Sequence, residues 1–135
     1  MTIQLSVKAR NDRLDALETT LGPSAVMKIF SGAAPANVAA ANSGTVLATL
    51  NLPADFMADA ASGQKTKSGT WQDLEADATG AAGHFRLYED DGVTCHMQGT
   101  VTITGGGGDM QVDNTSFAAG QQFTVTAFTL NEPNA

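Results

Sequence analysis

Two histidines, His84 and His96, are the residues whose type and spacing come nearest to a metal site. They lie in the segment HFRLYEDDGVTCHMQGTVTI, which predicts two β-strands around a tight turn, and the expected pairing puts both imidazoles on the outer face. Two imidazoles could share a metal ion, but a stable zinc site needs a third or fourth ligand nearby. Arg86 would also lie beside them and repel a cation. We therefore expect solvated or interfacial histidines and no metal site.

Four aspartates could supply oxygen ligands for Ca²⁺ if their loops met at one end of the fold. They are Asp90, Asp91, Asp109 and Asp113. Their spacing does not follow the ligand order of an EF-hand loop, so the sequence does not favour a calcium site. Paired carboxylates could also hydrolyse glycosidic bonds. However, no pair falls on an identifiable pocket wall, and aromatic residues make up only 6% of the chain, which is low for a carbohydrate cleft.

The run Gly105–Gly108 resembles a phosphate-binding loop only in composition, because no Lys-Ser/Thr pair and no strand-to-helix context follow it. We expect a flexible or tightly bent hairpin connection there. Cys95 is the single cysteine, so no intrachain disulfide can form, and its inner strand position predicts a buried, inert thiol. No serine or cysteine has a recognisable catalytic partner. We expect no catalytic residue and no cofactor, and the chain is not expected to be an enzyme.

The strands that carry these residues are predicted by alternation. From Val93 to Thr104, apolar residues or glycine alternate with polar residues, which is typical of a strand with one buried face. A loop of Asp90-Asp91-Gly92 leads into this strand, with Gly92 at the left-handed position of a three-residue hairpin loop. Pairing Glu89 with Val93 sets the register: Phe85 faces Met97, Leu87 faces Cys95, Arg86 faces His96 and His84 faces Gln98.

Residues 5–21 form the only convincing helix, with Ser6 as its cap and Gly22-Pro23 as its end. Its apolar stripe, interrupted by Arg10, consists of Val7, Leu14, Leu17 and Leu21. A helix of this length is marginal alone, so the stripe must dock on something. Two alternatives are open: the stripe packs across an open end of this domain's own sandwich, or it reaches a neighbouring subunit.

Further strands are predicted at 25–30, 45–52, 110–112 and 121–130, and Pro53 ends the second of these. The last strand has apolar residues on both faces near its end, which suggests that a helix, a loop or another subunit covers it. Residues 31–44 are rich in Ala, Gly, Ser, Asn and Pro and predict an ordered or semi-ordered loop. The polar run at 62–69 predicts a solvated loop. Trp71 is expected to pack in the core or at an edge.

The fold class that follows is mainly β, a single antiparallel β-sandwich that is jelly-roll-like in the broad sense, with one N-terminal α-helix. At 135 residues the chain is one domain, with an N-terminal helix or arm at 1–22 and a β-sandwich domain at 23–135. We count about seven or eight short strands from the pattern.

Composition excludes several classes of function. The chain has 7 basic and 14 acidic residues, a formal net charge of −7 that favours solubility. Lys and Arg are too few and scattered for nucleic-acid binding. No apolar run approaches about 18 residues, so no membrane span is expected. The opening MTIQLSVKAR lacks the pattern of a signal peptide, which predicts assembly in a cytoplasm.

Several segments together carry a resemblance that extends through nearly the whole chain. They are RNDRLDALETTLG, IFSGAAPANVAAA, LATLNLPADFMADAASGQKTKSGTW, GHFRLYEDDGVTCHMQGTV and GGGGDMQVDNTSFAAGQQFTVTAFTL. The combination resembles a family of small structural proteins of tailed bacteriophages and prophages. The resemblance implies a non-enzymatic virion component that is assembled in the bacterial host, contacts other virion proteins and forms homo-oligomers.

Two places in the virion are compatible with this resemblance. A head decoration or cement protein would bind the capsid lattice and bridge major capsid protein subunits, and this is the placement we favour. A tail or head–tail junction protein would instead form a ring, a tube attachment or a fibre base. In either case the residues expected to contact other subunits come from the helix and the small-residue loop: Val7, Arg10, Leu14, Leu17, Leu21, Ala33, Ala34 and Pro35.

A third possibility is a different class of function, a carbohydrate- or host-surface-binding β-sandwich module. Its candidate residues are Trp71, Tyr88 and the acidic loops. Saturable glycan binding by the isolated domain would separate this possibility from a purely architectural role.

Overall fold

A computed structural model describes residues 3–132 of the chain. The only helix in that range, α1 (Val7–Leu21), begins at Ser6, whose hydroxyl accepts a hydrogen bond from the Ala9 backbone N–H. It ends at Gly22, which adopts a φ of 83° and donates its N–H to the Glu18 carbonyl. The predicted helix and both of its ends are therefore confirmed. Within the same range, no helix is long and apolar enough to cross a membrane.

Nine strands make up the rest of the regular structure within residues 3–132. They are β1 (Val26–Ser31), β2 (Val46–Asn51), β3 (Gln64–Thr66), β4 (Gln72–Asp73), β5 (Gly80–Tyr88), β6 (Cys95–Ile103), β7 (Met110–Val112), β8 (Ser116–Phe117) and β9 (Phe123–Asn131). The predicted strands near 25–30, 45–52, 110–112 and 121–130 are all present. The number of strands exceeds the expected seven or eight. β4 and β8 are only two residues long, which is too short to produce a recognisable alternation in the sequence.

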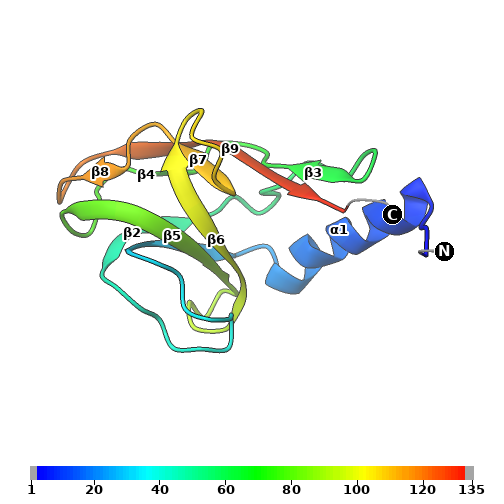
Figure 1. Cartoon of the computed structure of the whole chain (residues 1–135), viewed down its shortest axis with the longest axis horizontal. Coiled ribbons are helices and arrows are strands. Elements are labelled where there is room, and N and C mark those ends of the chain that lie inside the picture. The colour runs from blue at the N-terminus through cyan, green and yellow to red at the C-terminus, as the bar shows by residue number, and fades with distance from the viewer. Residues whose placement is uncertain (1–2, 133–135) are drawn as a thin grey trace.

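The strands form one mixed sheet that is not closed, in the order β2-β1-β5-β6-β7-β9-β3, with β4 on β9 and β8 on β5. Pairing is antiparallel except between β6 and β7, which run parallel. In Figure 1, β1, β2 and β5 form the lower part of the molecule, β3, β4 and β9 form the upper part, and α1 lies at one end. A mainly β fold with one helix is thus confirmed, whereas the expectation of a purely antiparallel arrangement is wrong.

The core lies where the sheet folds over on itself. Phe85 of β5 and Phe128 of β9 are on strands that are not neighbours, yet their ring centroids are 5.5 Å apart. Trp71 is fully buried against Phe128 and Phe56, and its indole N–H donates to the Phe56 carbonyl at 3.0 Å. The prediction that Trp71 packs in the core is therefore correct.

The register of the β5–β6 hairpin differs from the predicted one by two residues. Phe85 faces Gly99 and Leu87 faces Met97, rather than Met97 and Cys95. The loop is longer than expected because the Asp91 carboxylate accepts from the backbone N–H groups of Val93 and Thr94, which leaves Val93 77% exposed. A shift of two residues keeps Phe85 and Leu87 pointing into the core, whereas the bulge at His96 places Cys95 opposite Tyr88 and away from the predicted inner face.

A β-bulge explains the apolar residues on both apparent faces of β9. Val112 pairs with Val125 and Gln111 with Ala127, so Thr126 is an extra residue in β9. The bulge reverses the alternation, and Phe128 consequently points to the same core as Val125, while Ala127 is exposed. Strict alternation would have grouped Ala127 with the buried Val125, and the bulge moves it to the surface instead.

The glycine run does not form a hairpin connection, because the strands it joins are parallel. Val101 pairs with Met110 and Ile103 with Val112, so residues 104–109 must carry the chain back along β6. Connections between parallel strands usually need a dozen residues or more. Here the short return packs directly on Thr102: the Gly108 N–H donates to its hydroxyl, and a Cβ on Gly108 would lie 2.7 Å from its methyl carbon. Glycine is required by this close approach.

Candidate functional site

Helix α1 docks on the sheet of its own chain, at the end formed by β3 and β9 (Figure 1). Of the predicted apolar stripe, Leu14 and Leu21 are each 3% exposed and face the body. Val7 and Leu17 are 49% and 36% exposed and face outward. The stripe is therefore divided, with two residues used for folding and two left on the surface.

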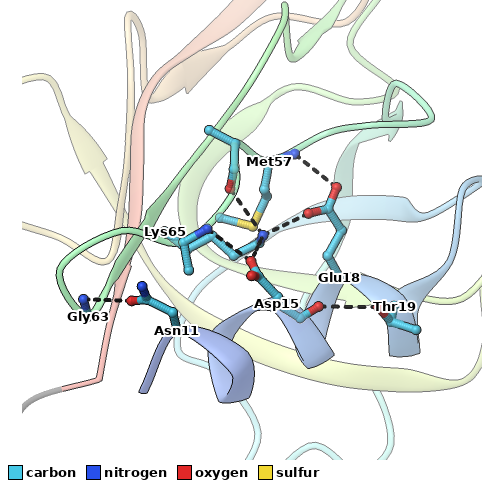
Figure 2. A network of polar contacts seen from close by, with 9 residues as sticks. Asn11, Asp15, Glu18, Thr19, Met57, Gly63 and Lys65 are labelled. Carbon is cyan, nitrogen blue, oxygen red and sulfur yellow. Dashed lines mark hydrogen bonds and ion pairs between the residues drawn. The ribbon is translucent and has the colours of Figure 1, made fainter. Parts of the chain in front are cut away.

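A buried lysine joins the helix to β3, as Figure 2 shows. The Lys65 side chain is 1% exposed, and its ammonium lies 2.6 Å from Asp15 Oδ1 and 2.9 Å from Glu18 Oε2. A third hydrogen bond goes to the Ala58 carbonyl at 3.0 Å. An ammonium has three donors, so all three are satisfied. Lys65 is thus a structural ion-pair partner and has no proton left to offer a ligand.

The carboxylates of this network also hold the chain that precedes β3. Asp15 Oδ1 accepts from the Ala60 N–H at 2.9 Å, and Glu18 Oε1 accepts from the Met57 N–H at 3.3 Å. One turn earlier, Asn11 accepts from the Gly63 N–H at 2.9 Å (Figure 2). Three polar side chains of α1 therefore bind the backbone of residues 57–63, which has no strand partner of its own for most of that length.

The electrostatics of the network favour the charged forms. The hydrogen bond from Lys65 and the one from the Ala60 N–H hold the pKa of Asp15 below its ordinary 3.8. Burial tends to lower the pKa of Lys65, but the hydrogen bonds and negative charges of Asp15 and Glu18 outweigh it and raise that pKa above 10.5. A buried ammonium is costly unless it is paired in this way.

An open pocket of about 430 Å³ lies beside the network, lined by Asp15, Glu18, Asp59 and Lys65 together with the turn at Gly22-Pro23. Of its charged side chains, Asp15, Glu18 and Lys65 are already paired with each other, and Asp59 is not part of that network. No group of three or more His, Cys, Asp and Glu residues within 3–132 is placed to hold a metal ion.

Arg10 and Arg13 connect the start of the helix to the end of β9. Arg10 donates to the Glu132 carbonyl at 3.2 Å, and Arg13 forms an ion pair with the Glu132 carboxylate at 2.8 Å. Arg10 also crowds Gly63, where a Cβ would lie 2.3 Å from the guanidinium. Gly63 and Ser62, both with positive φ, form the tight turn that leads into β3.

The polar run 62–69 is therefore not the solvated loop that its composition indicated. It contains β3, which pairs with β9 and places Lys65 on the inner side. If residues 64–66 had been recognised as a strand, alternation would have placed Lys65 on the face opposite to that of Gln64 and Thr66, which are exposed. A lysine, however, is seldom expected at a buried strand position.

Residues 31–44, here called the strap, cover the outer face of β5. Arg86 is 1% exposed beneath the strap and donates to the Val38 carbonyl at 2.6 Å and to the Ala40 carbonyl at 3.1 Å. Arg86 and the Tyr88 hydroxyl both donate to the Asn42 side chain. The strap is thus ordered, and it is fixed by an arginine that sequence reasoning placed on a solvated face.

The histidines lie in different environments. His84 is fully buried beneath the strap, stacked on Phe30 at 5.0 Å, and its Nδ1–H donates to the Gly32 carbonyl at 2.8 Å. His96 is the bulge residue of the hairpin, and its Nε2 lies 2.6 Å from the Glu89 carboxylate. The expectation of a solvated or interfacial imidazole is wrong for His84, because the strap covers it.

The strap carries the other predicted assembly residues. Ala33 is exposed, and Ala34 and Pro35 are half-buried. Gln98 of β6 donates to the Pro35 carbonyl at 2.8 Å, which ties this part of the strap to the sheet. Farther along, Val38 is an exposed large apolar side chain, at 38%. The predicted assembly residues therefore lie at two separate places. Those of the strap lie over β5 and β6, and those of α1 lie on a helix that packs against β3.

The remaining candidates form no common site. Asp91 is used in the hairpin turn, where hydrogen bonds from Thr94 and Val93 lower its pKa. Asp109 accepts from Thr100, and Asp113 accepts from the Thr124 N–H. Cys95 is half-buried rather than buried, with its thiol donating to the Met97 carbonyl at 3.3 Å.

The aromatic residues suggested for carbohydrate binding do not form a surface platform. Trp71 is 0% exposed and Tyr88 is 1% exposed. A sugar-stacking aromatic must present its face to the ligand, and these two rings are covered by the core and by the strap.

No family model, no curated protein and no solved structure matches this chain.

Proposed function

We propose that this chain is a structural protein of a tailed-bacteriophage virion, most suitably a head decoration or cement protein on the capsid lattice. The observation that carries the proposal is the way in which two surface segments of the chain, the strap and α1, are held. The strap and α1 are both fixed to the body by buried charged residues, Arg86 and Lys65, yet each keeps apolar or small side chains at the surface.

Rigid surface segments of this kind suit repeated assembly. Association costs less when the contacting groups are already ordered, because little conformational entropy is lost on binding. Val38 and the alanines around it on the strap, and Leu17 on α1, offer small, low-entropy contacts. Many weak contacts of this kind add up when many copies share one lattice.

We also propose that the folded-over sheet functions as a β-sandwich in which β1, β2 and β5 face β4 and β9. The contacts of Phe85 with Phe128 and of Trp71 with Phe128 across the interior support this proposal. The strand order differs from that of a regular jelly roll in its parallel β6–β7 pair.

The test is to localise the protein in particles produced by the bacterium that carries the sequence. Particles are separated into heads and tails, and the chain is quantified by mass spectrometry relative to the major capsid and tail proteins. We expect it in the head fraction, in a fixed ratio to the capsid protein. Its presence only in the tail fraction would move it to the tail, and its absence from particles while abundant in the lysate would overturn a virion role.

A matched pair of substitutions tests which surface docks. Val38→Asp adds a charge on the exposed strap and should lower occupancy in particles at least tenfold, with little change in the stability of the monomer. Val93→Asp adds the same charge at a more exposed valine in the β5–β6 loop and serves as the control. Equal occupancy of the two variants would show that the strap is not the docking surface.

A further inference from the structure

Three side chains of the sheet hold the strap, and each keeps one polar atom without a protein partner. Arg86 and His84 of β5 and Gln98 of β6 all donate to strap carbonyls, within residues 32–40. Arg86 Nε, His84 Nε2 and Gln98 Oε1 are buried, yet none of them forms a hydrogen bond within residues 3–132. Native structures rarely leave such atoms unpaired, because an unsatisfied buried donor or acceptor costs stability.

The three atoms belong to neighbouring side chains beneath one cover. Arg86 and Gln98 lie directly opposite each other on β5 and β6. The Cβ atoms of such a pair are about 5 Å apart, so the two side chains are in reach of each other. His84 lies two residues before Arg86 on β5 and therefore projects from the same face of the sheet. Both residues are fully buried, so bulk water does not reach them.

The contacts with the strap fix which of the three atoms donates and which accept. Arg86 Nε carries a hydrogen and can only donate. The Gln98 amide nitrogen donates to the Pro35 carbonyl at 2.8 Å, so the remaining Oε1 is an acceptor. His84 Nδ1 donates to the Gly32 carbonyl, so Nε2 of the neutral imidazole is also an acceptor. One donor and two acceptors therefore need a partner.

This combination of one donor and two acceptors selects a small neutral ligand. A cation would be repelled by the Arg86 guanidinium, and an anion would be repelled by the lone pairs of Gln98 Oε1 and His84 Nε2. Arg86 Nε and Gln98 Oε1 do not satisfy each other directly, since no hydrogen bond joins them. Water can accept and can donate twice, and a buried water typically makes about three hydrogen bonds to polar groups of this kind.

We propose that the strap encloses a water-binding site on the outer face of β5 and β6. The bound water accepts from the Arg86 Nε–H and donates to Gln98 Oε1, and its second hydrogen is donated to His84 Nε2. The water thereby joins the three side chains that hold the strap into one buried hydrogen-bond network. This inference concerns how the strap is held, and it stands whether or not the protein occurs in virions.

Nuclear magnetic resonance of the purified full-length chain tests the site through the Arg86 Nε proton. A water held beneath the strap gives NOE and ROE cross-peaks of opposite sign to that proton, whereas exchange of the proton with bulk water gives the same sign in both. We expect opposite signs for Arg86. Tyr88→Phe should give the same result, because it removes the hydroxyl that bonds to Asn42 and could otherwise relay the signal.

A matched pair of substitutions and a crystal structure complete the test. Gln98→Met removes the acceptor and should weaken the opposite-sign cross-peaks of Arg86 at least about fivefold, because the water loses one of its three partners. Gln122→Met, the same change at an exposed glutamine, should leave them unchanged. A crystal structure of the unsubstituted chain should show a water within about 3 Å of both Arg86 Nε and Gln98 Oε1.

Four outcomes would overturn the inference. The Arg86 proton could show cross-peaks of the same sign in both spectra, or it could show none. Its cross-peaks could be as strong in Gln98→Met as in Gln122→Met. The crystal structure could show a direct hydrogen bond from Arg86 Nε to Gln98 Oε1 with no water between them. The crystal structure and the spectra of the unsubstituted chain decide the question even if Gln98→Met does not fold.

Discussion

Burial of the Lys65 ammonium removes a charge from water, which costs several kcal/mol unless oxygen atoms replace the lost hydration. Asp15, Glu18 and the Ala58 carbonyl supply those oxygens from two segments that are distant in sequence. The pairing therefore links the position of α1 to that of β3. Removing the lysine leaves two carboxylates facing each other with no cation between them.

Lys65→Met, which keeps most of the side-chain volume, should lower the free energy of unfolding by about 2 kcal/mol, less than a fully buried pair because Asp15 still reaches water. Urea denaturation with a constant m-value measures this loss. Lys8→Met is the control, since its ion pair with Asp12 is exposed to solvent and should contribute far less to stability than the Lys65 pair. Equal losses in the two variants would show that Lys65 is not the link between helix and sheet.

The pH dependence of stability follows from the same residues. The folded pKa of Asp15 is lowered, so its contribution is present above its ordinary 3.8 and is lost as the pH falls through the folded value. The folded pKa of Lys65 is raised, so its contribution is complete below 10.5 and is lost as the pH rises through the folded value. Urea midpoints should therefore fall at both extremes of pH.

Asp15→Asn should flatten the acid side of this profile, since the amide has no proton to gain as the pH falls below the ordinary 3.8 and through the lowered folded pKa of Asp15. Its stability near neutral pH should be lower than that of the unsubstituted chain, because the ion pair with Lys65 is lost. A variant whose urea midpoint falls as steeply with acid as that of the unsubstituted chain would contradict the role given to Asp15.

At the scale of elements, α1 shows why truncation is a poor test of docking. Leu14 and Leu21 are buried in the chain's own body, so deleting residues 1–21 removes part of the core as well as any contact surface. Substitutions on opposite faces of the helix separate the two roles. The same helix thus provides both the test and its control.

Leu14→Ala should lower the free energy of unfolding by about 2–4 kcal/mol, because a cavity replaces a buried side chain. Leu17→Ala, at 36% exposure on the same helix, should cost less than about 1 kcal/mol. Thermal unfolding followed by circular dichroism measures both. Similar losses of unfolding free energy in the two variants would show that Leu14 does not lie on the buried face of α1.

The elements also show how far the sequence alone could predict this fold. The helix and its caps depend on local signals at Ser6 and Gly22, and they are confirmed. The hairpin register and the β9 bulge depend on single events, the Asp91 turn and the extra Thr126, which alternation does not detect. Arg86 and Lys65 were missed because their partners come from the strap and from α1, and only the tertiary fold brings these together.

For the whole molecule, the contacts of α1 predict one cooperative unit. Leu21 belongs to the same core cluster as Trp71 and Phe128, and the Lys65 network joins the helix to β3. An independent arm at 1–22 would instead require a helix stable on its own, and a helix of this length in water is marginal. The helix should therefore melt together with the sheet.

We expect the fluorescence of Trp71, which reports on the core, and the far-ultraviolet circular dichroism, which includes α1, to change at the same urea concentration. The m-values from the two probes should agree, because both measure exposure of the same surface. Lys65→Met provides a sharper form of the test. It weakens the link between α1 and β3 directly, so the two transitions should move to lower urea together. A circular-dichroism transition that precedes the fluorescence transition, in either protein, would show that the helix is a separable arm.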